Sequence, residues 1–203
     1  IIIIARNNDG VMQLNDIMSE AHDTGFYYRP RIDDELLFSL NPNNFIVTSA
    51  CVAGIWNDRE LLLALNRHFG KHFFLEMQAH NTDFQKQVNT AMYEFSKASG
   101  IAMIHANDSH YILPEDAKYR DIFLKGKDRK YPEEDGMILD YPDDKTIINR
   151  YVRQGIFDKK QAEELLYNTL VFDDCSEITI INDDIKLPIA RSEERFSRNA
   201  ETD

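Results

Sequence analysis

The sequence predicts an α/β fold in which parallel strands alternate with helices. Over the first 130 residues, apolar runs of strand length alternate with segments whose apolar residues recur at helical spacing. Such alternation is typical of right-handed crossovers, which place parallel strands in an open sheet or a barrel. Polar residues with ligand-type side chains follow directly after the apolar runs. The carboxyl ends of parallel strands are where these folds carry their chemistry.

Composition limits the classes of protein to which the chain can belong. With 203 residues, 43% of them hydrophobic, it is long enough for one sizeable core. The net charge of −12 argues against a free-standing protein held mainly by the nucleic-acid backbone, because such binding depends on Lys and Arg. A local site where metal ions offset carboxylates stays open. Two distant cysteines predict a reducing, cytoplasmic location, and the absence of long apolar runs predicts no membrane partner.

The first two strands are expected at residues 1–5 and 45–50. Four isoleucines at the start are typical of a buried parallel strand, and we expect residues of the same fold upstream of it. We expect a helix after the first strand, ending at Gly25, and a short helix at residues 33–40. The intervening loop is aromatic and basic, so it could stack on bases and hold phosphate, or its aromatics could pack onto the domain; the candidate contact residues are Tyr27, Tyr28, Arg29 and Arg31.

The next two strands are expected at residues 73–79 and 101–106, with helices at 58–69, 82–99 and 114–127. On the third strand, Glu76, Gln78 and His80 share one face because side chains alternate along a strand. Such a row is unusual for a core and predicts a polar interior or rim. The alternative is an edge strand with one solvated face.

The pattern changes after residue 130. Residues 131–144 are rich in proline and acidic residues and predict a loop, and helices are expected at 143–154 and 158–174. Residues 178–181 and 185–188 look extended. We therefore divide the chain into an α/β domain at 1–130, a largely helical segment at 131–188, and a polar tail at 189–203 with too few apolar residues to fold alone.

The fourth strand ends in a candidate site formed by Asn107, Asp108 and His110. Two side chains two residues apart share a face when the backbone is extended, and a carboxylate and an imidazole together suit a divalent metal. The alternative is that Asp108 caps the next helix and His110 is a surface residue. Cys51 lies just past the second strand, where a thiol is most often a small hydrophobe.

Four motifs carry a resemblance to a known family. In order and roughly in spacing, GFYYRPRID (25–33), TSACVAGI (48–55), FLEMQAHN (74–81) and NDSHYILPEDA (107–117) resemble the PHP (polymerase and histidinol phosphatase) domain of bacterial DNA polymerase III alpha subunits. NTLVFDDCSEITI (168–180) resembles the segment by which that family leaves the domain. The resemblance implies a distorted TIM-like (β/α) barrel, here lacking its N-terminal part and followed by a helical segment, with divalent metals at its mouth.

The resemblance also implies roles for individual residues. Cys51, Asp108 and His110 take the positions of metal ligands, the last two also being catalytic. His80 takes a supporting position beside the metals, as do Asn107, Glu76 and Gln78. The other ligands of the family would lie upstream of residue 1. His105 and Ala106 depart from the usual pattern before Asn-Asp, which indicates a divergent version.

Three functions follow as hypotheses. The first is a metal-dependent 3′→5′ exonuclease using Zn, Mn or Mg, whose ions activate water and stabilise the attacking and leaving oxygens. The second is a metal-free platform that stabilises the polymerase and binds its proofreading exonuclease subunit. A stand-alone phosphoesterase is the third. No polymerase palm is present in the sequence, so DNA and other replisome subunits are expected only as partners of the parent polymerase, and this chain alone should be inactive.

Overall fold

The computed structural model describes residues 1–175 and 178–179, and its centre is one four-stranded sheet. In chain order and in spatial order the strands are β1 (Ile2–Ala5), β2 (Phe45–Thr48), β3 (Phe73–Gln78) and β4 (Met103–Ala106). β2, β3 and β4 run parallel to one another, as the alternation predicts. β1, however, is antiparallel to β2, with Ile2 opposite Thr48 and Ala5 opposite Phe45. The prediction of four parallel strands is therefore wrong for the first of them.

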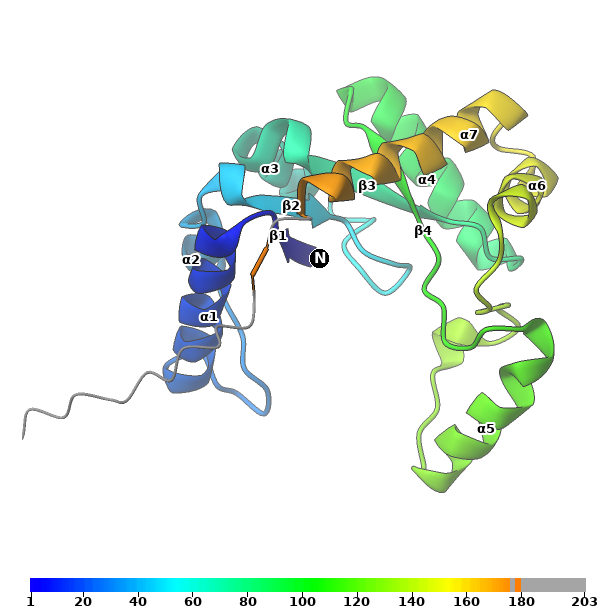
Figure 1. Cartoon of the computed structure of the whole chain (residues 1–203), viewed down its shortest axis with the longest axis horizontal. Coiled ribbons are helices and arrows are strands. Elements are labelled where there is room, and N and C mark those ends of the chain that lie inside the picture. Colours follow the sequence, from blue (N-terminus) through cyan, green and yellow to red (C-terminus); the bar gives the residue numbers. More distant parts are fainter. Residues whose placement is uncertain (176–177, 180–203) are drawn as a thin grey trace, which may run out of the picture.

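The connection between β1 and β2 explains this reversal. A parallel neighbour requires a crossover that returns the chain to the start of the strand. Here α1 (Asn8–Asp23) leads away from the sheet and α2 (Asp34–Phe38) leads back beside it, so the chain re-enters at the end it left (Figure 1). The Arg6 amide donates to the Asn44 carbonyl at 2.8 Å and closes this excursion. Two antiparallel helices thus replace the single crossover helix that a parallel pair needs.

Polar side chains fix where the helices begin. Each accepts a hydrogen bond from a backbone N–H of the first turn, which would otherwise lack a partner. Asn7 and Asp33 do so for α1 and α2. The same role belongs to Asp58 for α3 (Arg59–Phe69), Thr82 for α4 (Asp83–Ser99), Asp143 for α6 (Asp144–Gln154) and Asp158 for α7 (Lys159–Tyr167).

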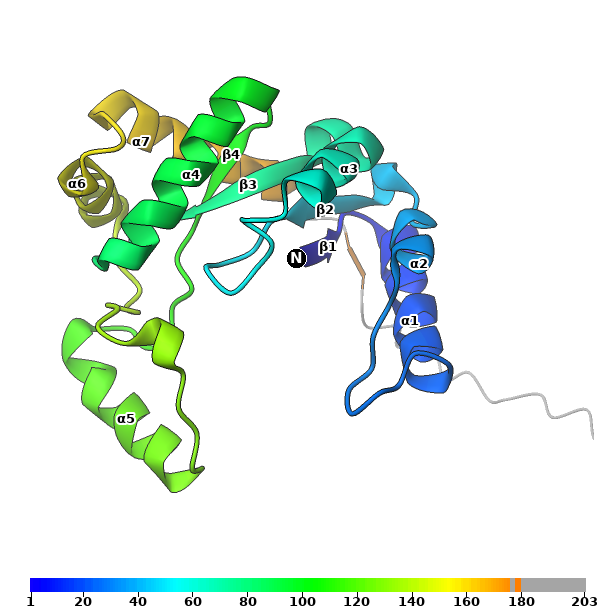
Figure 2. The ribbon, with the colours of Figure 1, turned by 180° about the vertical axis from the view of Figure 1, so that it is seen from behind.

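The sheet is covered on both faces. The face that includes Phe45, Leu75 and Met77 packs against α3 and α4 in the main core. The opposite face includes Ile46, Phe74 and Ile104, and Val171 and Phe172 of the 3₁₀ helix η5 (Asn168–Cys175) pack on it. Figures 1 and 2 show α3 and α4 on one side of the sheet and η5 across the other, while α7 adds Ala162 and Leu165 to the main core and contacts α4. The result is a layered α/β domain.

Two arms extend from opposite ends of the sheet toward the same side (Figures 1 and 2). The α1–α2 arm comprises residues 8–41. The α5 arm comprises residues 111–137, with α5 (Ala117–Gly126) and the 3₁₀ helix η4 (Pro132–Glu134). An ion pair between Arg120 and Glu134 ties the helix to the returning segment.

The C-terminal predictions are tested only in part. The expected helices at 143–154 and 158–174 correspond to α6 and to α7 followed by η5. Ile178 and Thr179 are described but form no strand. The extended segment expected at 185–188 and the polar tail at 189–203 lie outside the described residues.

Candidate functional site

The carboxyl ends of β2, β3 and β4 meet at one edge of the sheet because these strands are parallel. The candidate residues leave the sheet there, from the turn after β2, from the end of β3 and from the loop after β4. Both loops contain a residue other than glycine with a positive φ: Ala50 at 63° and Asp108 at 52°. Such backbone conformations are disfavoured for L residues and are found more often at functional sites than elsewhere.

Glu76 is the centre of a buried polar row on β3. The Thr48 hydroxyl donates to its Oε2 at 2.7 Å, and the Gln78 amide donates to its Oε1 at 2.9 Å. All three side chains are buried, so the predicted polar interior is confirmed and the solvated-edge alternative is wrong. Burial raises the pKa of Glu76, the nearby Asp108 charge adds to this, and the two hydrogen bonds oppose it.

His80 continues this row beyond the strand. Its Nδ1 lies 3.1 Å from the Ile138 carbonyl oxygen, so Nδ1 carries the hydrogen in the neutral ring. Its Nε2 is buried and has no hydrogen-bond partner among the described residues. Burial lowers the pKa of His80, while the Asp108 charge opposes the change. In the neutral form of the ring, with its hydrogen on Nδ1, the lone pair of Nε2 is unused among the described residues.

Asp108 and His110 are brought together, but not by the predicted geometry. Oδ1 of Asp108 lies 3.8 Å from Nδ1 of His110, and each side chain is about one third exposed, at 35% and 32%. The positive φ of Asp108 shows that this backbone is not extended, so the expectation that the two share a strand face is wrong. Instead, the chain turns at Asp108 and its carbonyl oxygen lies 2.9 Å from His110 Nδ1.

Residues 138–141 cross over this loop and hold it. Backbone N–H groups of His110 and Tyr111 donate to the Leu139 carbonyl, at 2.8 and 3.3 Å. The crossing segment is fixed in turn by buried Asp140, whose carboxylate pairs with both terminal nitrogens of Arg150 at 2.6 and 2.7 Å. This bidentate pair was not predicted. No periodic pattern links the two residues, because their contact depends on how α6 packs.

Asn107 turns toward a second polar group that sequence reasoning also missed. Its Oδ1 lies 2.9 Å from Nε2 of His105, whose Nδ1 lies 2.7 Å from the Tyr151 hydroxyl. That hydroxyl donates to the Met77 carbonyl at 2.7 Å. Burial lowers the pKa of His105 to about 4, although the contact with Asn107 opposes the shift. Asn107 is thus engaged by His105, which is held in turn by Tyr151 of α6.

The metal ligands expected from the resemblance do not assemble into a full set. Within the part of the chain that the structure describes, no three His, Cys, Asp or Glu residues are grouped so that they could hold a metal ion. Protein sites for zinc normally supply at least three ligands in fixed geometry. Asp108 and His110 form a pair, while Cys51 is half-buried in the turn after β2 and does not complete such a group with them. Among the residues described, Cys51, Asp108 and His110 do not by themselves form a three-ligand zinc site.

The aromatic and basic loop lies elsewhere, between α1 and α2. Tyr28 is 82% exposed and Tyr27 is 64% exposed, so these rings do not pack onto the domain and that alternative is wrong. The guanidinium of Arg31 lies over the Tyr27 ring, 5.1 Å from its centroid. Exposed rings beside guanidinium groups are available to a partner.

Comparisons with known proteins agree on one kind of relative. The chain is 35% identical over 134 residues to the DNA polymerase III subunit alpha of Borreliella burgdorferi, a match that covers 61% of this chain and 12% of the relative. The DNA polymerase III subunit alpha of Thermus aquaticus is 36% identical over 132 residues, covering 60% of this chain and 11% of that protein. That of Treponema pallidum is 33% identical over 136 residues, covering 61% and 12%.

The chain resembles one region of these large subunits. It matches only about 12% of the length of the relative from Borreliella burgdorferi. No family model matches the chain. Among the described residues, no helix combines the length and the apolar character needed to cross a membrane.

Proposed function

We propose that the chain is the PHP-type portion of a replicative DNA polymerase of the alpha-subunit kind and serves it as a structural platform. The support is the similarity to several alpha subunits together with the four motifs in the same order. Under this proposal the parallel strands β2, β3 and β4 belong to the wall of a distorted TIM-like barrel. The partners are DNA through the parent polymerase, its proofreading exonuclease subunit and other replisome subunits, all in the cytoplasm.

The observation that carries the platform role is the closed hydrogen-bond network around Glu76. A carboxylate that supports a metal site holds one of the metal ligands by a hydrogen bond. Glu76 is instead buried, its two oxygens are occupied by Thr48 and Gln78, and its pKa is raised. The network links β2 to β3, so its role is to hold the two strands together rather than to bind a metal.

Titration with Zn²⁺ and Mn²⁺ and a 3′→5′ hydrolysis assay on single-stranded DNA test the proposal together. The platform role predicts no stoichiometric metal binding and no hydrolysis by the 203-residue chain. It also predicts that the chain binds the remaining portion of its polymerase when the two are mixed. Stoichiometric metal binding accompanied by hydrolysis would overturn the platform role.

A metal-dependent 3′→5′ exonuclease is the second candidate, and a specific observation favours it. Asp108 lies beside His110, and its charge also acts on His80, whose buried Nε2 is unpaired among the described residues. In this candidate, Cys51, Asp108 and His110 bind Zn, Mn or Mg. The supporting residues are His80, Asn107, Glu76 and Gln78, and the DNA contacts are Tyr27, Tyr28, Arg29 and Arg31.

Asp108→Asn separates the two candidates, because it removes the charge and keeps the shape. The exonuclease candidate predicts that the variant loses any metal-stimulated hydrolysis shown by the parent polymerase while its melting temperature stays within about 2 °C. The platform predicts unchanged hydrolysis. Asp116→Asn, outside the cluster at the strand ends, is the matched control.

A further inference from the structure

The α5 arm presents an apolar helix face that nothing in the described chain covers. No residue of α5, which is described throughout, is buried. Tyr119, Ile122 and Phe123 share one face at spacings of three and four, and they are 61%, 66% and 59% exposed. Contiguous apolar surface of this kind on a protein marks an interaction site.

The same helix is basic in a strongly acidic chain. Residues 117–130 contain six Lys or Arg and two Asp, whereas the whole chain has a net charge of −12. Lys118 and Lys125 are exposed beside the apolar face, four residues before and three residues after Ile122. The partner that suits this arm is therefore a surface that is apolar in its centre and acidic at its rim.

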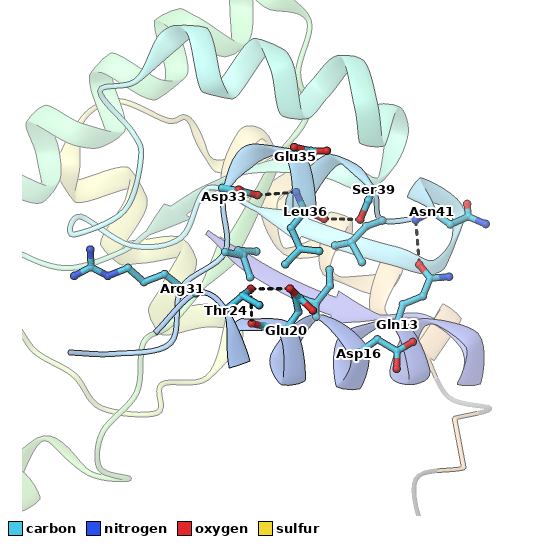
Figure 3. A pocket seen from close by; sticks show the side chains of 14 residues that line it. Gln13, Asp16, Glu20, Thr24, Arg31, Asp33, Glu35, Leu36, Ser39 and Asn41 are labelled. Atoms are coloured by element: carbon cyan, nitrogen blue, oxygen red, sulfur yellow. Dashed lines mark hydrogen bonds between the residues drawn. The ribbon is translucent and has the colours of Figure 1, made fainter. Parts of the chain in front are cut away.

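The α1–α2 arm contains a groove of that description. It has a volume of about 920 Å³, within the usual range for binding pockets, and its apolar lining is Ile17, Ile32, Leu36 and Leu40. Four carboxylates line it, from Asp16, Glu20, Asp33 and Glu35. Among the described residues that line it, Arg31 is the one cation, and Figure 3 shows its side chain extending away from the groove.

We propose that two copies of this chain form a closed dimer in which the α5 arm of each docks into the acidic groove of the other. The arms lie at opposite ends of the sheet, so α5 does not reach the groove of its own chain (Figures 1 and 2). Both arms extend toward the same side. In the proposed dimer a half-turn, about an axis that lies between the arms and is perpendicular to the plane containing both, places the α5 arm of each copy beside the α1–α2 arm of the other.

The two-fold arrangement makes dimerisation favourable although each copy has a net negative charge. It forms two identical contacts at once, which doubles the buried apolar surface and the number of attractive charge pairs. Ile122 in the middle of this face favours a protein groove, because an aliphatic side chain does not stack on a base, whereas Tyr119 and Phe123 suit either kind of partner. The second copy therefore matches the arm in polarity and charge.

Sedimentation velocity of the whole chain, with charge-reversed variants, tests the dimer. The arm variant Lys118→Glu/Lys125→Glu and the groove variant Asp16→Lys/Glu20→Lys should each weaken dimerisation at least about tenfold. All four positions are exposed, so circular dichroism should show both variants folded. Raising the salt from about 0.1 M to about 1 M should also weaken the wild-type dimer, because the Debye length falls from about 10 Å to about 3 Å.

Mixing the two variants is the decisive step. In the mixed dimer one contact is wild type and the other has both charges reversed, so every contact is again complementary and a one-to-one dimer should return. Lys86→Glu/Lys160→Glu, on α4 and α7, makes the same change in net charge as the arm variant and should leave the dimer intact.

Three results would overturn the proposal. The first is a wild-type chain that stays monomeric at every concentration tested. The second is a dimer that survives both charge reversals, or that Ile2→Lys on β1 abolishes while they do not. The third is that the mixed variants do not associate, while the wild-type chain binds a single-stranded oligonucleotide through Lys118 and Lys125. That result would make the arm a nucleic-acid-binding surface.

Discussion

At the scale of single residues, burial moves the pKa values of Glu76 and His105 in opposite directions. The pKa of His105 falls to about 4, and that of Glu76 rises. Both shifts favour the uncharged side chain, because neither strand face gives a charge access to water. Burial therefore favours the uncharged form of both groups, whereas Asp108 and His110 remain partly exposed.

His105 should make the stability of the fold depend on pH. Between its ordinary pKa of 6.5 and about 4, the unfolded chain binds a proton that the folded chain does not, so the free energy of unfolding falls as the pH falls. The full effect is about 3 kcal/mol. The raised pKa of Glu76 acts in the opposite sense, because the folded chain then holds its proton more readily.

Urea unfolding of His105→Gln and of the wild type, from about pH 7.5 to about pH 4.5, measures the contribution of His105 to the pH dependence of the unfolding free energy. The variant cannot titrate at this position, while Glu76 and His80 titrate in both proteins and cancel in the difference. The wild type should lose more stability than the variant as the pH falls. Parallel curves would show that His105 is not the group responsible.

The polar row was predictable and the two long-range pairs were not. Alternation along a strand places Glu76, Gln78 and His80 on one face whatever the rest of the fold does. The contacts of His105 with Tyr151 and of Asp140 with Arg150 depend on where α6 packs, and no local pattern encodes that position. The extended backbone expected at Asp108 was wrong for a local reason. A positive φ at a residue other than glycine has no reliable signal in the sequence.

At the scale of elements, α1 and α2 decide the topology. Strand and helix types were predicted correctly through residue 127, yet the direction of β1 was not. The alternation rule assumes one helix per crossover. α2 has only five residues, but it is enough to bring the chain back to the end of β1.

Close packing of α1 on this junction gives a prediction at Gly10. A Cβ there would lie 2.6 Å from the Asn44 carbonyl oxygen, so Gly10→Ala should push α1 away from the start of β2. We expect a loss of about 2 kcal/mol in unfolding free energy. At Gly126, near the end of α5, a Cβ would meet nothing within 4 Å, so Gly126→Ala should stabilise by about 0.5 kcal/mol. Equal effects in chemical unfolding would contradict this packing.

At the scale of the whole molecule, net charge hides a division between the arms. α1 contains four acidic residues and neither Lys nor Arg, and α5 and its extension are basic. Net charge alone argued only against a free-standing protein held mainly by the nucleic-acid backbone. The acidic and the basic segment form separate surfaces because the sheet places them at opposite ends of the molecule (Figure 1). Sequence patterns do not reveal this arrangement.

The last prediction concerns the free side of β1. Among the described strands β1 pairs only with β2, and Ile2 is 43% exposed. An unpaired, apolar strand edge is a template for adding a strand from another molecule. The chain should therefore aggregate on heating, and at high salt this should continue because the contact is made by backbone hydrogen bonds and apolar side chains.

Ile2→Lys should slow this aggregation, because a charge on an edge strand opposes pairing with a second copy. Light scattering during a thermal ramp at about 1 M salt, where contacts between charged arms are screened, gives the measurement. Leu63→Lys on α3 replaces an apolar side chain of similar exposure, 37%, and should leave the onset unchanged. A sharp, reversible melt of a wild-type monomer without scattering would show that β1 is not an aggregation edge.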